Sequence, residues 1–89
     1  MRDLTSINLS FVDTDEFIGL PLEAQALYFH LLLRAEDDGL ITNAKAIVRA
    51  IRCTEHSLEL LEIIDYVRST EEGFYYITNW DVLTEGEVF

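Results

Sequence analysis

The chain has 89 residues, with 17 acidic against six basic side chains and a formal net charge of -11. This length leaves room for one domain, and the hydrophobic share of 49% indicates a folded core, which excludes a disordered acidic tail. A single cysteine excludes an internal disulfide, two histidines are too few for a usual zinc site, and no apolar run reaches membrane-spanning length. We therefore expect one cytoplasmic domain over residues 1–89, without metal or other cofactor.

The first predicted elements are a strand and two helices. Residues 6–11 alternate apolar and polar side chains, which is the period of a half-buried strand. Asp13 and Glu16 have the spacing of a capping box that opens a short helix ending at Gly19. Pro21 fits the first position of a longer helix, whose wide apolar surface marks it as the central helix of the core. Its repeating row is Leu22, Ala26, Phe29 and Leu33, flanked by Leu27, Tyr28, Leu31 and Leu32.

Polar residues end this helix and two further helices follow. The run Glu36-Asp37-Asp38-Gly39 contains a glycine able to take a left-handed conformation, and it lacks the spacing of a calcium loop. Leu40 and Ile41 form a short predicted strand. The next helix, capped by Thr42 or Asn43, runs to about residue 51. The one after it is capped by Thr54 and runs to about Asp65, with an inner row of Leu58, Leu61 and Ile64.

The last predicted element is a β-hairpin. Residues 66–70 and 74–80 are rich in β-branched and aromatic side chains, and they flank Glu71-Glu72-Gly73 as the loop. The order strand, short helix, long helix, short strand, helix, helix and hairpin predicts an α+β fold of the winged helix-turn-helix kind. It would have a three-helix core, an N-terminal strand and the hairpin as its wing.

One segment carries a resemblance to a known family. Residues 20–31, LPLEAQALYFHL, followed by RAEDDG at 34–39, resemble the N-terminal domain of phage replisome organiser proteins related to DnaD. The resemblance extends more weakly from residues 7–17 to the strand at 76–80. It implies a winged helix that acts in phage replication initiation and usually carries a further C-terminal region. Family members tend to follow the tryptophan strand with a basic tail, whereas Trp80 precedes Asp81, Glu85 and Glu87.

The carboxylates concentrate where a winged helix meets DNA. By position, the helix over 55–65 would be the recognition helix, and its outward glutamates would repel the phosphate rows of a major groove. One helical row is sparser than a DNA strand, but added wing and tail carboxylates would approach the charge density of a nucleic acid backbone on a shared face. The competing interpretation is a solvated face that contacts nothing. The predicted protein-binding acidic surface consists of Glu55, Glu59, Glu62, Asp65, Glu71, Glu72, Asp81, Glu85 and Glu87.

The leading hypothesis is a non-enzymatic, phage-type winged-helix protein that binds a protein partner through this acidic surface. It would inhibit a host nucleic-acid-binding machine as a DNA mimic in the host cytoplasm, a role of the anti-CRISPR kind. The alternative is a replication-initiation module that contacts DNA through Lys45, Arg49 and Arg52, a stripe at i, i+4 and i+7. The competing interpretation of this stripe is a set of salt bridges with nearby carboxylates. A third hypothesis is a homodimerisation domain without a ligand.

Catalysis finds no support in the sequence. No serine or cysteine stands at a recognisable spacing from a histidine, and there is no glycine-rich phosphate loop. His30 is predicted to be a partly buried packing residue and Cys53 a small buried residue in a turn. Tyr75, Tyr76 and Trp80 lie on one predicted strand, whose alternation places some of them outward, where they would mark a protein-binding or dimer surface.

Overall fold

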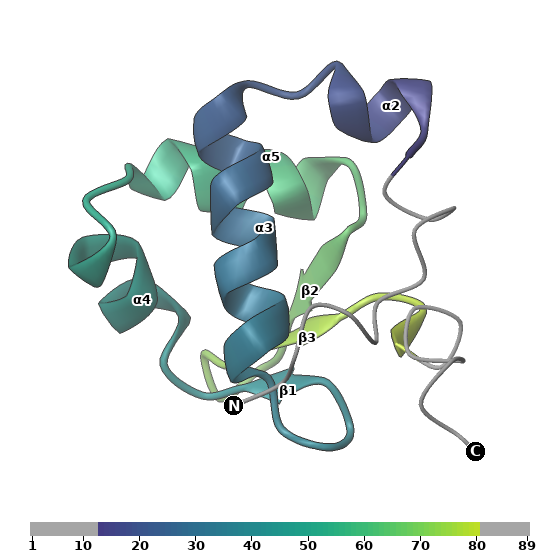
Figure 1. The fold of residues 1–89 in the computed structure, drawn as a ribbon. Coiled ribbons are helices and arrows are strands. Elements are labelled where there is room, and N and C mark those ends of the chain that lie inside the picture. The colour runs from purple at the N-terminus through teal and green to yellow at the C-terminus, as the bar shows by residue number, and fades with distance from the viewer. Residues whose placement is uncertain (1–12, 81–89) are drawn as a thin grey trace.

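The longest helix, α3 (Leu22–Arg34), stands in the middle of the molecule, and α5 crosses behind it in Figure 1. The computed structural model describes residues 13–80. The predicted strand at 6–11 lies outside these residues. The described part of the chain is a small α+β domain with four helices and a three-stranded antiparallel sheet. Its elements are α2 (Asp15–Ile18), α3, β1 (Leu40–Ile41), α4 (Ala44–Ala50), α5 (Glu55–Ile63), β2 (Val67–Ser69) and β3 (Tyr75–Ile77).

The buried face of α3 differs from the predicted one. Leu22 is 81% exposed, Ala26 is exposed, and Phe29 and Leu33 are only half-buried. The recurring row is therefore not the buried side of α3, and the four flanking residues belong to the core instead. Apolar side chains cover most of the surface of α3, so their period alone does not identify the strip that packs against α4 and α5. The buried strip is Ala24, Leu27, Tyr28, Leu31 and Leu32.

Helix α2 anchors an aromatic cluster against α3. Thr14 caps α2, since its hydroxyl accepts the amide of Phe17 at 3.2 Å, so the predicted cap at Asp13 was wrong by one residue. Phe17 is buried, and its ring centroid lies 5.5 Å from that of Tyr28 and 6.0 Å from that of Tyr66. Pro21 directly precedes α3 and is not its first helical residue.

The sheet contains the predicted hairpin. Strand β3 lies between β1 and β2, with Leu40 opposite Tyr76 and Val67 opposite Ile77. The loop closes as a turn in which the Gly73 amide donates to the carbonyl of Thr70 at 3.1 Å, with Gly73 in the left-handed region at φ 85. The strands are shorter than predicted, and β3 ends at Ile77, before Trp80.

Trp80 packs against the turn that follows α3. Helix α3 ends at Arg34, and Gly39 takes the predicted left-handed conformation at φ 86. A Cβ on Gly39 would lie 2.9 Å from Cγ of Trp80. The Trp80 indole donates to the carbonyl of Asp37 at 2.8 Å, and the residue is only 8% exposed. The end of the hairpin is thereby held against the loop that leads into β1.

Candidate protein-binding surface

The outward side of α5 carries carboxylates. The helix buries Ser57, Leu58 and Leu61, while Glu55 and Glu59 are exposed one helical turn apart, about 6 Å along the axis. Neither of these two glutamates forms an ion pair within residues 13–80. Two unpaired negative charges therefore stand in solvent on this side.

Tyr75 of β3 lies within electrostatic reach of the same helix. Burial raises the pKa of the Tyr75 phenol, and the negative charges of Glu62, Glu55 and Glu59 raise it further. A phenolate would be repelled by each of these carboxylates. All three glutamates predicted on this helix therefore lie close enough to Tyr75 of β3 to act on its phenol through their charge.

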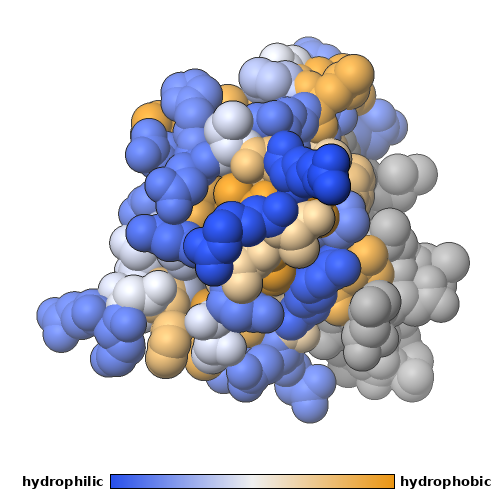
Figure 2. Space-filling view, turned by 90° about the vertical axis from the view of Figure 1, so that its left-hand side faces the viewer, coloured by the Kyte–Doolittle hydropathy of each residue, from blue (hydrophilic) through white to orange (hydrophobic). Residues whose placement is uncertain are grey.

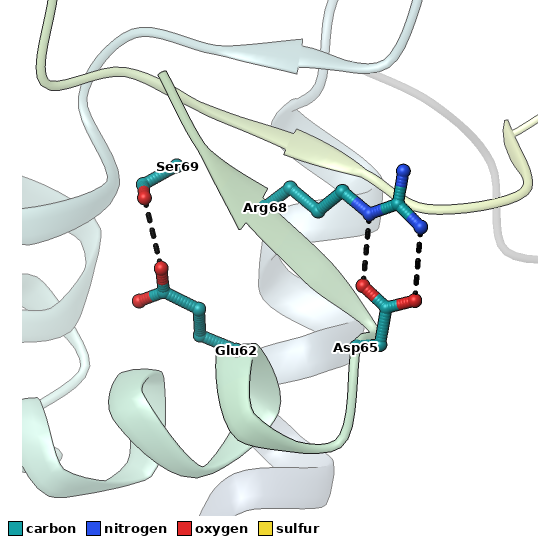
Figure 3. A network of polar contacts seen from close by, with 4 residues as sticks. All are labelled: Glu62, Asp65, Arg68 and Ser69. Carbon is teal, nitrogen blue, oxygen red and sulfur yellow. Dashed lines mark hydrogen bonds and ion pairs between the residues drawn. The ribbon is translucent and has the colours of Figure 1, made fainter. Parts of the chain in front are cut away.

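The hairpin binds two of the predicted surface carboxylates (Figure 3). The Ser69 hydroxyl donates to Glu62 Oε2 at 2.8 Å, which leaves the charge of Glu62 in place. Arg68 donates from Nε and Nη2 to the two oxygens of Asp65 at 2.8 and 3.0 Å. This bidentate contact lowers the pKa of Asp65 and compensates its charge. Asp65 therefore adds little to the net negative charge of the surface.

The position of Asp65 explains why sequence reasoning missed Arg68. The prediction extended the helix to Asp65, but α5 ends at Ile63 and Asp65 is left-handed at φ 66. The chain reverses there, with the amides of Asp65 and Tyr66 donating back to the carbonyls of Glu62 and Leu61 in the last turns of α5. Only the spacing of three residues between an acid and an arginine hinted at the pair.

A further carboxylate that the sequence did not single out sits at the start of α5. Glu23 of α3 accepts from the Thr54 amide at 3.4 Å, the Thr54 hydroxyl at 2.9 Å and the Ser57 hydroxyl at 2.5 Å. The hydrogen bonds from Ser57 and Thr54 lower the pKa of Glu23. Thr54 stands at the predicted N-cap position, but its hydroxyl donates to Glu23 and makes no cap to α5. The donors of Thr54 and Ser57 stand at the N-terminus of α5, where a helix can bind a phosphate, but here they are hydrogen-bonded to Glu23.

The remaining predicted acidic residues divide into two groups. Glu71 and Glu72 are exposed at the tip of the hairpin. Asp81, Glu85 and Glu87 lie outside the described residues.

The predicted basic stripe is only partly helical. Lys45 and Arg49 are exposed on α4, one turn apart, but α4 ends at Ala50 and Arg52 lies in the following turn at φ 62. None of the three basic residues forms an ion pair within residues 13–80, so the predicted salt bridges are absent there. Figure 2 shows the side of the molecule on which α4 lies in Figure 1, and hydrophilic side chains cover most of it, with small apolar areas between them.

The histidine, cysteine and tyrosine side chains that the sequence singled out differ in their burial and contacts. His30 is half-buried, and its Nδ1 lies 2.9 Å from Nη1 of Arg34. Cys53 is also half-buried, and burial raises the pKa of its thiol, which disfavours the reactive thiolate. Tyr76 is exposed, whereas Tyr75 is half-buried. Within the described ranges, no three metal-ligating side chains come together.

No family model matches this chain, and neither a curated protein nor a solved structure matches it. In the part of the chain that the structure describes, every helix is too short or too polar to span a membrane.

Proposed function

We propose that this chain is a non-enzymatic, phage-type winged-helix protein that binds a protein partner through its acidic surface and inhibits a nucleic-acid-binding protein as a DNA mimic. The winged-helix assignment is supported by the element order and by the sheet order β1-β3-β2. In that architecture, α5 is the recognition helix and the β2–β3 hairpin is the wing. The observation that carries the proposal is that Glu55 and Glu59 are both exposed on α5 and form no ion pair within residues 13–80.

The charge on α5 favours a protein partner over DNA. A recognition helix lies between two rows of phosphates, where Glu55, Glu59 and Glu62 would each be repelled. Glu23 adds a carboxylate at the first turn of α5, where many DNA-binding helices accept a phosphate. A basic nucleic-acid-binding channel would be attracted by the same charges.

Mimicry needs a density of charge near that of DNA. Without Asp65, which Arg68 compensates, five of the predicted carboxylates remain among the described residues. Three of them approach Tyr75, and two are at the hairpin tip. The acidic surface that we propose therefore extends from α5 along the hairpin and does not include Asp65.

The first experiment is a titration of the protein with duplex DNA at about 20 mM salt, where the Debye length is roughly 20 Å and phosphate-driven binding is strongest. We expect no binding. Binding that disappears in Arg49→Ala would reject mimicry in favour of a DNA-binding module.

The second experiment looks for the partner. The immobilised protein is exposed to a bacterial lysate, and bound proteins are eluted with duplex DNA. We expect DNA to release a nucleic-acid-binding protein, and the double variant Glu55→Gln/Glu59→Gln to capture less of it. Glu36→Gln is the matched control, because Glu36 is also an exposed glutamate but follows the C-terminal end of α3 and is not part of the proposed surface. A captured protein that DNA does not displace would reject mimicry.

The alternative function is a replication-initiation module that binds DNA. It is favoured by one observation, the absence of ion pairs at Lys45, Arg49 and Arg52 within residues 13–80, which leaves these cations free to meet phosphates. Three such contacts give a slope of log K against log salt of about -2.7. The same DNA titration, repeated over a range of salt concentrations, measures this slope.

A further inference from the structure

An apolar side chain stands beside the exposed carboxylates of α5. Ile63, the last residue of the helix, is 76% exposed. Glu55, Glu59 and Ile63 follow one another at i, i+4 and i+8, so they form an oblique line on the helix surface that rises about 6 Å and turns about 40° around the axis at each step. Ile63 is not required for packing of the core, because α5 contributes Leu58 and Leu61 to the core from another side of the helix.

We infer that this line is a docking surface for a cationic amphipathic segment of the partner protein. The segment presents arginine or lysine side chains to Glu55 and Glu59 and an apolar side chain to Ile63. The inference rests on the proposed function and narrows the partner to a protein whose binding segment is both basic and apolar. Protein interfaces typically combine a buried apolar contact with polar contacts at its rim.

Charge complementarity selects this occupant. Glu55 and Glu59 have no ion-pair partner within the described residues, and Glu62 adds a third carboxylate toward the hairpin, where Ser69 holds it without compensating its charge. A second copy of this chain docked face to face on α5 would set carboxylates against carboxylates. A nucleic acid would meet the same repulsion and would leave Ile63 in water.

The apolar contact distinguishes this surface from a purely electrostatic one. Attraction between exposed charges falls as salt shortens the Debye length, whereas burial of an aliphatic side chain does not. An interface that uses Ile63 therefore keeps part of its affinity at high salt. An interface made of carboxylates alone loses nearly all of it.

Synthetic peptides test the inference directly. The probe is a helical peptide with two arginines one turn apart and a leucine a further turn along, and its control has serine in place of the leucine. Both are titrated into the 15N-labelled full chain, followed by amide chemical shifts. We expect the largest shifts at Glu59 and Ile63, and an affinity about tenfold higher for the leucine peptide, from the apolar area that it buries.

Two variants provide matched controls. Ile63→Ser should lower the affinity for the leucine peptide to that for the serine peptide. Ile18→Ser should leave it unchanged, because Ile18 is also an exposed isoleucine, at 57%, but lies on α2. Both positions are exposed, so neither substitution removes a core contact.

The outcomes separate this inference from the proposed function. If both peptides shift α5 resonances with equal affinity, or if Ile18→Ser acts like Ile63→Ser, the role of Ile63 is rejected while the acidic surface stands. If neither peptide shifts α5 resonances, both the inference and the acidic protein-binding surface are rejected.

Discussion

Glu23 links two helices through a single carboxylate. It joins α3 to the start of α5, and its hydrogen bonds lower its pKa. A carboxyl whose pKa is lower in the folded state stabilises that state above its ordinary pKa, and the contribution is lost as the pH falls through the lowered value. The ionised Glu23 therefore stabilises the fold at neutral pH and does so no longer in acid.

We predict that Glu23→Gln lowers the Tm at pH 7 and that its difference from the native chain shrinks as the pH falls below about 4. Thermal melts followed by circular dichroism over this pH range measure the difference. Glu36→Gln is the control, since the Glu36 side chain makes no hydrogen bond within the described residues. A difference that is constant with pH would mean that Glu23 acts through its shape and not through its charge.

The hydroxyl of Tyr28 differs from the Glu23 carboxylate in that it has no hydrogen-bond partner among residues 13–80. The Tyr28 side chain is fully buried. We predict that Tyr28→Phe raises the free energy of unfolding by about 1 kcal/mol, because it removes an unsatisfied hydroxyl and keeps the ring contacts with Phe17 and Tyr66. Urea denaturation measures the change. Tyr66→Phe should instead be destabilising, since the side chains of Thr14 and Glu16 both act on the Tyr66 hydroxyl and its pKa.

At the scale of the elements, the contact between Gly39 and Trp80 holds the end of the hairpin against the turn after α3. We predict that Gly39→Ala costs about 2 to 3 kcal/mol, from the left-handed backbone and from the clash with the indole. Gly73→Ala is the matched control, with φ 85 and no atom within 4 Å of its added Cβ, and should cost about 1 kcal/mol. If urea denaturation gives the same loss of unfolding free energy for both variants, the Trp80 indole moves aside for the added methyl group at no measurable cost.

Some elements of the fold could be predicted from the sequence, and others could not. The α+β class and the hairpin were predicted correctly, because alternation and a loop glycine are local signals. The buried face of α3 was not, because it is apolar on nearly every side. Glu23 was missed because its partners lie 31 and 34 residues further along the chain. Arg68 was missed because a left-handed Asp65 is not foreseen from helical periodicity. The winged helix itself stays a prediction.

At the scale of the whole molecule, like charges repel across the fold. With a net charge of -11, the folded state gathers negative charge that the unfolded chain spreads out. We predict that the Tm rises when NaCl is increased from about 10 to 150 mM, as the Debye length falls from roughly 30 to 8 Å. The double variant Glu71→Gln/Glu72→Gln should show a smaller rise in the same melts. A Tm that falls with salt would mean that attractive charge pairs dominate.

Two hydrogen-bonded links tie the hairpin to the chain at the end of α5. Ser69 of β2 binds Glu62 in the last turn of the helix, and Arg68 binds Asp65 in the reversal that follows it (Figure 3). These links fix the orientation of the hairpin relative to the end of the helix. For a partner that contacts both elements, as we propose, helix and hairpin within residues 13–80 are already held together before association, so that less conformational entropy is lost there on binding.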